Sequence, residues 1–121
     1  MSIPVPRASR GSVAAGRLNA CHANAAILWI DGTVASIGTG YALSDDGLWR
    51  QHSWGVDADG TLVETTDHRT LYVGLALSGM AALRFAVSNA DWHLTAVFTA
   101  GGSRARDLAA IPQSARPPTG D

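Results

Sequence analysis

Three residues of this chain have side chains that together could perform covalent catalysis. Cys21 is the only cysteine of the 121 residues, and Glu64 is the only glutamate. His52 lies between them in the sequence. A thiol, an imidazole and a carboxylate are the groups of a cysteine nucleophile system, in which the imidazole moves protons and the carboxylate orients it. Cys21, His52 and Glu64 are therefore the candidate catalytic residues.

Cys21 lies at the start of a predicted helix. The segment from Leu18 to Ile30 is rich in alanine and lacks glycine and proline, a composition that favours helix. The first turn of a helix stabilises a thiolate, the reactive form of cysteine, through unpaired N–H groups and the helix dipole. A lone cysteine among alanines is also typical of inert packing. The catalytic interpretation therefore requires a partner for the thiol.

A hairpin is predicted to bring Glu64 close to His52. The segment from Leu48 to Val56 has the composition of a strand, and the turn signal at 57–60 falls midway between the two residues. Side chains directly opposite each other on paired strands are about 5 Å apart, so a carboxylate–imidazole hydrogen bond is expected. Such a bond fixes the ring tautomer and supports its positive charge. A structural strand histidine and a solvent-facing glutamate are the alternatives.

The predicted strand also suggests residues that would contact a substrate. Alternation along a strand places Arg50 and Trp54 on the same face as His52. Trp54 is expected to hold the imidazole or line a cleft. Arg50 is a candidate for binding a substrate carboxylate, with coverage of apolar surface as the alternative.

The elements around these residues predict an α+β fold. Short turns permit an antiparallel meander, and the Cys21 helix and a second helix would pack against it. A domain is expected over 17–100, between a flexible arm at 1–16 and a flexible tail at 101–121. The predicted strands are 33–43, 48–56, 61–66 and 70–77, followed by a helix at 79–88 and a last strand or extended edge at 93–100.

Composition excludes several classes of function. The net charge of −1 and the pI near 6.4 give no electrostatic basis for binding nucleic acid or an anionic membrane. One cysteine cannot form an internal disulfide, and the first residues do not resemble a signal peptide, so a cytoplasmic location is expected. No cofactor or metal is predicted, because no paired cysteine or histidine motif accompanies the ligand types present. Those ligand types are provided by Cys21, His22, His52, Glu64 and His68.

The motifs resemble those of papain-like and transglutaminase-like proteins, over roughly residues 19–75. The shared features are a cysteine that begins a helix, a His-Ser-Trp strand (52–54, with serine in place of alanine) and a Glu-Thr-Thr strand (64–66, in place of Asp-Pro-Thr). The resemblance implies that Cys21 is the nucleophile, His52 the general base and acid, and Glu64 the orienting carboxylate. It makes Asn19, Asn24 and the Cys21 backbone N–H the candidates for stabilising an oxyanion.

The expected activity is acyl transfer through a Cys21 thioester. Hydrolysis of an amide, by a peptidase or deamidase, is the leading form, and transfer to an amine is the second. The expected substrate is a peptide, a protein or a small amide or thioester. The alternative is an inactive member of the same fold that binds a protein partner or forms a homodimer through exposed tryptophan and an unpaired strand edge.

Overall fold

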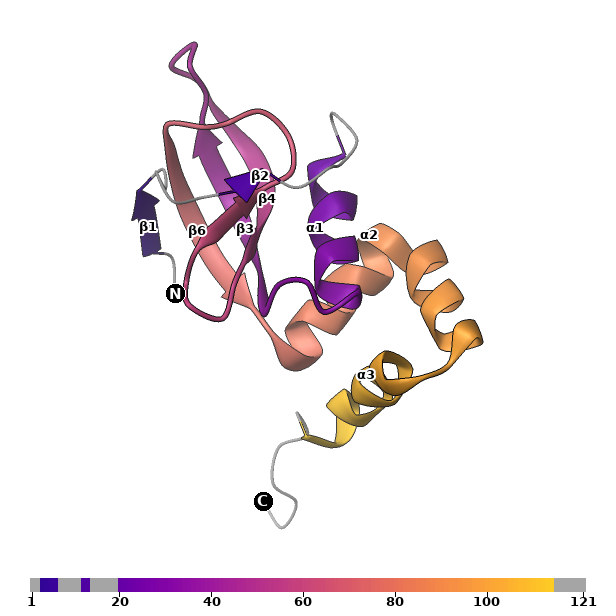
Figure 1. Ribbon diagram of the computed structural model, residues 1–121. Coiled ribbons are helices and arrows are strands. Elements are labelled where there is room, and N and C mark those ends of the chain that lie inside the picture. Colours follow the sequence, from indigo (N-terminus) through magenta and orange to yellow (C-terminus); the bar gives the residue numbers. More distant parts are fainter. Residues whose placement is uncertain (1–2, 7–11, 14–19, 115–121) are drawn as a thin grey trace.

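The computed structural model describes the backbone of residues 3–6, 12–13 and 20–114 and the side chains of residues 20–111, and within them it has an α+β fold (Figure 1). The predicted fold class is thereby confirmed. The elements in chain order are β1 (Ile3–Pro6), β2 (Ser12–Val13), α1 (Cys21–Ile30), β3 (Ser36–Leu43), β4 (Trp49–Val56), β5 (Leu62–Glu64), β6 (Leu71–Leu77), α2 (Gly79–Ala100) and α3 (Ser103–Ser114).

Strand β3 lies at the centre of the sheet, with β4 on one side and β6 on the other, both antiparallel. Strand β5 extends the sheet beyond β4, and β1 extends it beyond β6. The predicted meander is therefore correct from β3 to β5, but β6 pairs with β3 and not with β5. Turn signals define where a strand ends, whereas the partner of a strand after a longer connection depends on tertiary packing.

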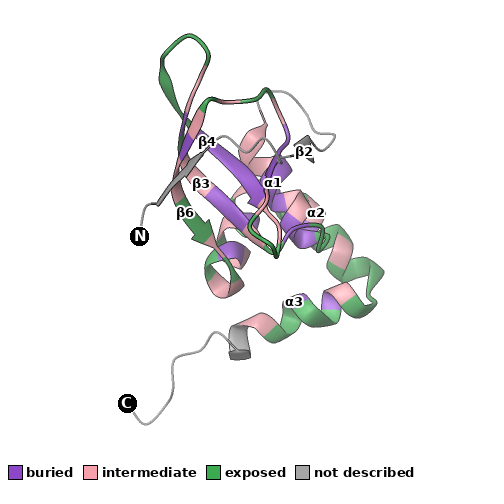
Figure 2. Ribbon diagram, turned by 60° about the vertical axis from the view of Figure 1, so that its left-hand side comes forward, coloured by how far each residue is buried: buried purple, intermediate pink, exposed green. Residues whose placement is uncertain are grey.

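The helices form layers on one face of the sheet. Helix α1 packs directly on β3 and β4, α2 packs against α1, and α3 packs against α2 (Figure 1). Figure 2 shows buried residues on the central strands and on parts of α1 and α2, whereas α3 is mostly exposed. The core residues of α1 are Ala25, Ala26, Trp29 and Ile30. This interface fixes the position of the helix start, and with it the position of Cys21.

Helix α2 differs from its prediction. The segment 93–100, predicted as a strand or extended edge, is helical, and the helix continues past Ser88 through a kink at Ala90. The buried residues of α2 are Ala82, Ala86, Ala90 and Leu94, which recur every four positions. This spacing forms a stripe on one helix face, and small side chains allow close packing against α1. The four-residue spacing indicates a helix, whereas the composition of 93–100 taken alone also fits a strand.

The terminal segments also differ from expectation. Within the predicted arm, Ile3–Pro6 pairs with β6 and Ser12–Val13 pairs with β5. Within the predicted tail, Ser103–Ser114 is a helix. Arg104 of this helix donates hydrogen bonds to the carbonyl oxygens of Trp29 and Ile30 at the end of α1, at 2.6 Å each. Residues 1–2, 7–11 and 14–16 of the predicted arm and 115–121 of the predicted tail lie outside the described residues.

Glycines on β3 and β6 make room for the tryptophan of the His-Ser-Trp strand. A Cβ atom added to Gly38 would lie 2.0 Å from Nε1 of Trp54. One added to Gly74 would lie 2.2 Å from the backbone oxygen of Thr39 and 3.0 Å from the same indole. Trp54 itself is only 2% exposed. The indole therefore lies directly across the backbone of β3, a close approach that glycine permits.

We predict that Gly38→Ala destabilises the protein by about 2 kcal/mol or more, because the added methyl group overlaps the Trp54 indole. The measurement is urea unfolding of the single variant. In the Trp54→Leu background the same substitution is expected to cost much less, which identifies the indole as the clashing group. An equal cost in both backgrounds would contradict this packing.

Candidate active site

The Cys21 thiol is the first side chain of α1 and is partly exposed. Burial alone raises its pKa, but a hydrogen bond with His52 and smaller contributions from Ser53 and His22 lower it below its ordinary value. The backbone N–H groups of the first helical turn add to this effect. The position of Cys21 in the first turn is thus as predicted, and its surroundings favour the thiolate.

His52 comes from the middle of β4 and is 2% exposed. Its Nε2 atom lies 2.8 Å from Oε1 and 3.0 Å from Oε2 of Glu64. Nδ1 is therefore the ring nitrogen that remains for the Cys21 thiol. Burial lowers the pKa of His52, but the hydrogen bonds with Cys21 and Glu64 outweigh burial, so the pKa is raised. The three predicted catalytic side chains form one connected chain of polar contacts.

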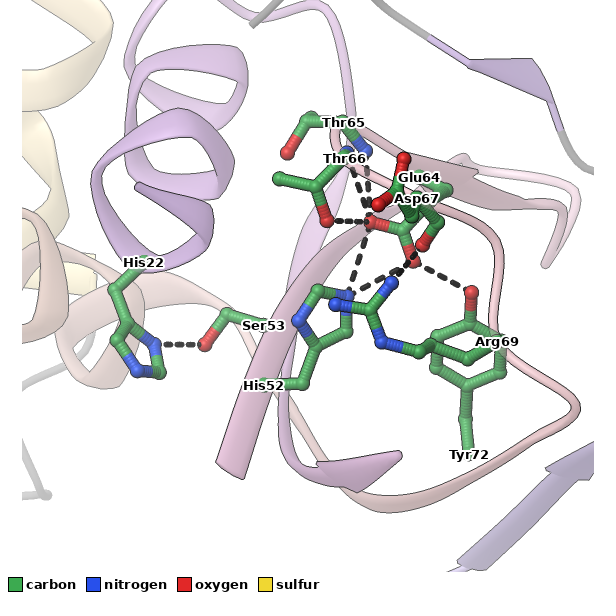
Figure 3. Close-up of polar contacts among 9 residues, drawn as sticks. All are labelled: His22, His52, Ser53, Glu64, Thr65, Thr66, Asp67, Arg69 and Tyr72. Atoms are coloured by element: carbon green, nitrogen blue, oxygen red, sulfur yellow. Dashed lines mark hydrogen bonds and ion pairs between the residues drawn. The ribbon is translucent and has the colours of Figure 1, made fainter. Parts of the chain in front are cut away.

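Glu64 is fully buried at the end of β5, where five donors surround its carboxylate (Figure 3). Burial raises the pKa of Glu64, but the hydrogen bonds from His52 and Tyr72 and from the Thr66 backbone lower it to about 2. Glu64 is therefore ionised near neutral pH and supports a positive charge on the ring. The donors are His52 Nε2, Tyr72 Oη, the backbone N–H groups of Thr65 and Thr66, and Thr66 Oγ1.

The strand register differs from the predicted one. Gly55 pairs with Val63 across β4 and β5. One step further along, the same register sets Glu64 beside Trp54. The contact with His52 therefore runs diagonally across the strand pair, a separation that requires a long side chain. The extra methylene of glutamate, relative to the aspartate of the resembled motif, supplies this reach.

Tyr72 is a site residue that the sequence analysis missed. It lies on β6, is fully buried, and its hydroxyl donates to Glu64 Oε1 at 2.5 Å. Burial and the adjacent Glu64 carboxylate raise the pKa of Tyr72. Its ring centroid is 5.0 Å from that of Trp54 and 6.1 Å from that of His52. No local signal identifies Tyr72, because it reaches Glu64 only through the pairing of β6 with β3.

The predicted supporting residues have other positions. Trp54 is buried against His52, which fits the expectation that it holds the imidazole. It does not line the cleft at Cys21, so its position there does not support a substrate contact. Arg50 lines the cleft but forms an ion pair with Asp46, at 2.8 Å. Asn24 is buried and does not line the cleft, so its position does not support an oxyanion role. Asn19 lies outside the described residues.

His22 is also part of the site. Its Nδ1 atom lies 2.5 Å from Ser53 Oγ, which in turn donates to Thr39 Oγ1 at 2.9 Å. The serine of the His-Ser-Trp strand, where the resembled motif has alanine, therefore ties the start of α1 to the sheet. Burial, and then the nearby His52, lower the pKa of His22. His22 is thus expected to be neutral near neutral pH, and it leaves His52 as the charged imidazole.

Cys21 and His52 open on a cleft with a volume of about 310 Å³. Its other lining residues are His22, Arg50, Gln51, Thr66, Asp67 and Arg69. Within the described part of the chain, no group of three or more histidine, cysteine, aspartate or glutamate side chains is arranged to hold a metal ion. Among the same residues, no helix has the length and apolar character that a membrane span requires.

Comparison of the chain with protein-family models, with curated proteins and with solved structures found no match.

We predict that the Glu64 carboxylate makes the free energy of unfolding depend on pH in the acid range. Its pKa of about 2 lies below the ordinary 4.5. The lowered pKa contributes on the order of 3 kcal/mol at neutral pH, and this is lost as the pH falls through 4 towards 2. Urea unfolding across that range is expected to show a shallower pH dependence for Glu64→Gln than for the wild type. Parallel profiles would contradict the assignment.

We predict that Tyr72→Phe keeps the fold but costs roughly 1.5–3 kcal/mol, because Glu64 loses a donor to its charged form. The same loss raises the pKa of Glu64, and the more basic, less compensated carboxylate raises the pKa of His52. Urea unfolding measures the first effect, and NMR titration of the His52 ring measures the second. Tyr41→Phe is the matched control, since Tyr41 is 55% exposed. Equal behaviour of the two variants would show that the Tyr72 hydroxyl has no such role.

Proposed function

We propose that this protein catalyses cysteine-dependent acyl transfer on an amide or thioester, with Cys21 as the nucleophile. The observation that supports this most strongly is the contact chain from the Cys21 thiol through His52 to the buried Glu64. The lowered pKa of the thiol and the raised pKa of the imidazole are the directions that a thiolate–imidazolium pair requires. This is also the chemistry that the resemblance to papain-like and transglutaminase-like proteins implies.

In the first step the Cys21 sulfur attacks the substrate carbonyl carbon. A carbon–sulfur bond forms, and the bond from that carbon to the leaving amine or thiol breaks. The proton on Nδ1 of His52 passes to the leaving group, so the imidazole becomes neutral. Glu64 stays ionised throughout and holds Nε2, which keeps Nδ1 directed at the sulfur.

In the second step water or an amine attacks the thioester. Nδ1 of His52 takes a proton from the attacking group, a carbon–oxygen or carbon–nitrogen bond forms, and the carbon–sulfur bond breaks. The thiolate–imidazolium pair is thereby restored. Negative charge on the substrate oxygen develops near the start of α1, where the Cys21 backbone N–H and the helix dipole stabilise it. No residue among those lining the cleft distinguishes water from an amine.

We predict that iodoacetamide alkylates Cys21 roughly tenfold faster than free cysteine near neutral pH, because a larger fraction of the thiol is ionised. His52→Ala is expected to remove most of this advantage and to move the pH midpoint of the reaction upward. Mass spectrometry of the labelled protein follows the rate without ambiguity, since the chain has one cysteine.

His68→Ala is the matched control for this experiment. His68 is exposed in the connection between β5 and β6 and does not line the cleft. Its removal is expected to leave the rate unchanged. A wild-type rate no higher than that of the unfolded protein, or an equal effect of the two histidine substitutions, would contradict the proposed function.

A further inference from the structure

Two arginines line the cleft at Cys21, and their surroundings differ. The guanidinium of Arg50 is held by Asp46, with Nη1 3.1 Å from Oδ1 and Nη2 2.8 Å from Oδ2. This bidentate pair lies on the exposed β3–β4 hairpin. The charge of Arg50 is therefore already balanced within the protein, and its donors on that side are already engaged.

Arg69 has no such partner in the part of the chain that the structure describes. Its Nη1 donates to the backbone carbonyl oxygen of Asp67, which is a neutral acceptor. Its Nε is buried and has no hydrogen-bond partner there. The ion pairs found among the described residues are Arg50–Asp46, His52–Glu64 and His93–Asp31. Among the described residues Arg69 thus has no carboxylate within ion-pair distance, although Asp67 lines the same cleft.

The nearest buried carboxylate does not neutralise the charge of Arg69. Figure 3 shows the Arg69 guanidinium beside His52 and Tyr72, close to Glu64. The hydrogen bonds to Glu64 nevertheless come from the imidazole, from the tyrosine hydroxyl and from threonine groups. Both oxygens of Glu64 are occupied by these donors. The remaining donors of Arg69 are therefore not needed to hold Glu64.

An arginine whose charge is unpaired is costly to keep partly buried unless something binds it. The planar guanidinium matches a carboxylate, which it binds through two N–H groups. Arg69, Cys21 and His52 line the same cleft of about 310 Å³. A group bound by Arg69 would therefore belong to the same small molecule or peptide segment whose carbonyl meets the thiol.

We propose that Arg69 binds a carboxylate of the substrate, so that the preferred acyl donor carries a carboxylate close to the carbonyl that Cys21 attacks. This inference rests on the proposed function, since it concerns the substrate of the same site. It replaces Arg50, which the sequence suggested for this role, with an arginine that follows the Glu-Thr-Thr segment. An acidic side chain and a free C-terminal carboxylate both provide the required chemistry.

Alkylating reagents that differ only in a carboxylate test this proposal without a known substrate. Iodoacetate and iodoacetamide form a short pair, and 3-maleimidopropionate and its amide form a longer one. Rates with Cys21 are measured for the full chain at one pH, each divided by the rate with free cysteine. The ratio of acid to amide then reports attraction of the carboxylate. The charge of His52 attracts the two acid reagents in every variant. A change of the acid-to-amide ratio on substitution of Arg69 therefore reports the contribution of Arg69.

We expect Arg69→Gln to lower the acid-to-amide ratio roughly tenfold with at least one reagent pair, as loss of a charge-assisted hydrogen bond implies. Arg69→Lys is expected to restore part of the ratio, because it keeps the charge. Arg50→Gln is the matched control and should leave the ratio unchanged. Circular dichroism and the urea midpoint establish that each variant is folded. If Arg69→Gln does not fold, Arg69→Lys provides the test.

Three results would overturn the inference, and they are distinguishable. If Cys21 reacts rapidly with the amide reagents but Arg69→Gln does not change the ratio, Arg69 does not bind carboxylates and the proposed function stands. If Arg50→Gln lowers the ratio as much as Arg69→Gln does, the effect is not specific to Arg69. The inference then fails as well, and the proposed function again stands. If Cys21 reacts no faster than free cysteine with either amide, the proposed function fails and the inference fails with it.

Discussion

The buried ion pair between His52 and Glu64 is the interaction on which the rest of the site depends. Removing a carboxylate from water costs several kcal/mol, and a single partner rarely compensates for that cost. Here two oxygens accept hydrogen bonds from an imidazole, a phenol, a threonine hydroxyl and two backbone N–H groups. The charge is thereby held at one place and in one orientation. Because Glu64 holds Nε2, the other ring nitrogen faces the thiol.

The fold supplies these partners from four separate segments. Helix α1 brings the thiol, β4 the imidazole, β5 and its following turn the carboxylate and the threonines, and β6 the tyrosine. The aromatic rings of Trp54 and Tyr72 lie beside His52 and exclude water from that side. Glycine at position 38 lets the Trp54 indole cross β3. The packing of α1 on the sheet and on α2 then fixes the position of Cys21 relative to the ring.

Local chemistry in the sequence was sufficient to predict which three side chains would meet. The composition before Ile30, the turn at 57–60 and the motif around His52 are local signals, and each predicted a feature that the structure contains. The α+β class followed from the same signals. The diagonal register between His52 and Glu64 was missed because turn chemistry alone does not define register to one residue.

The features that escaped prediction are those that depend on distant pairing. Tyr72 reaches Glu64 only because β6 joins β3, and Ser53 gains its role only because His22 faces it across the helix–sheet interface. Arg69 was missed for a different reason, since an arginine in a connection has no periodic context. The helical stripe of α2 was obscured because the apolar residues of 93–100 fit a strand as well as a helix.

The most direct test of this account is a pH titration of the Cys21 thiolate by its ultraviolet absorbance, in the wild type and in His52→Ala. Since the chain has one cysteine, the signal belongs to one group. The account predicts a wild-type midpoint below the ~8.5 of a free thiol, and a midpoint shifted upward in the variant. A wild-type midpoint at or above that of a free thiol, unchanged by removal of the imidazole, would contradict it.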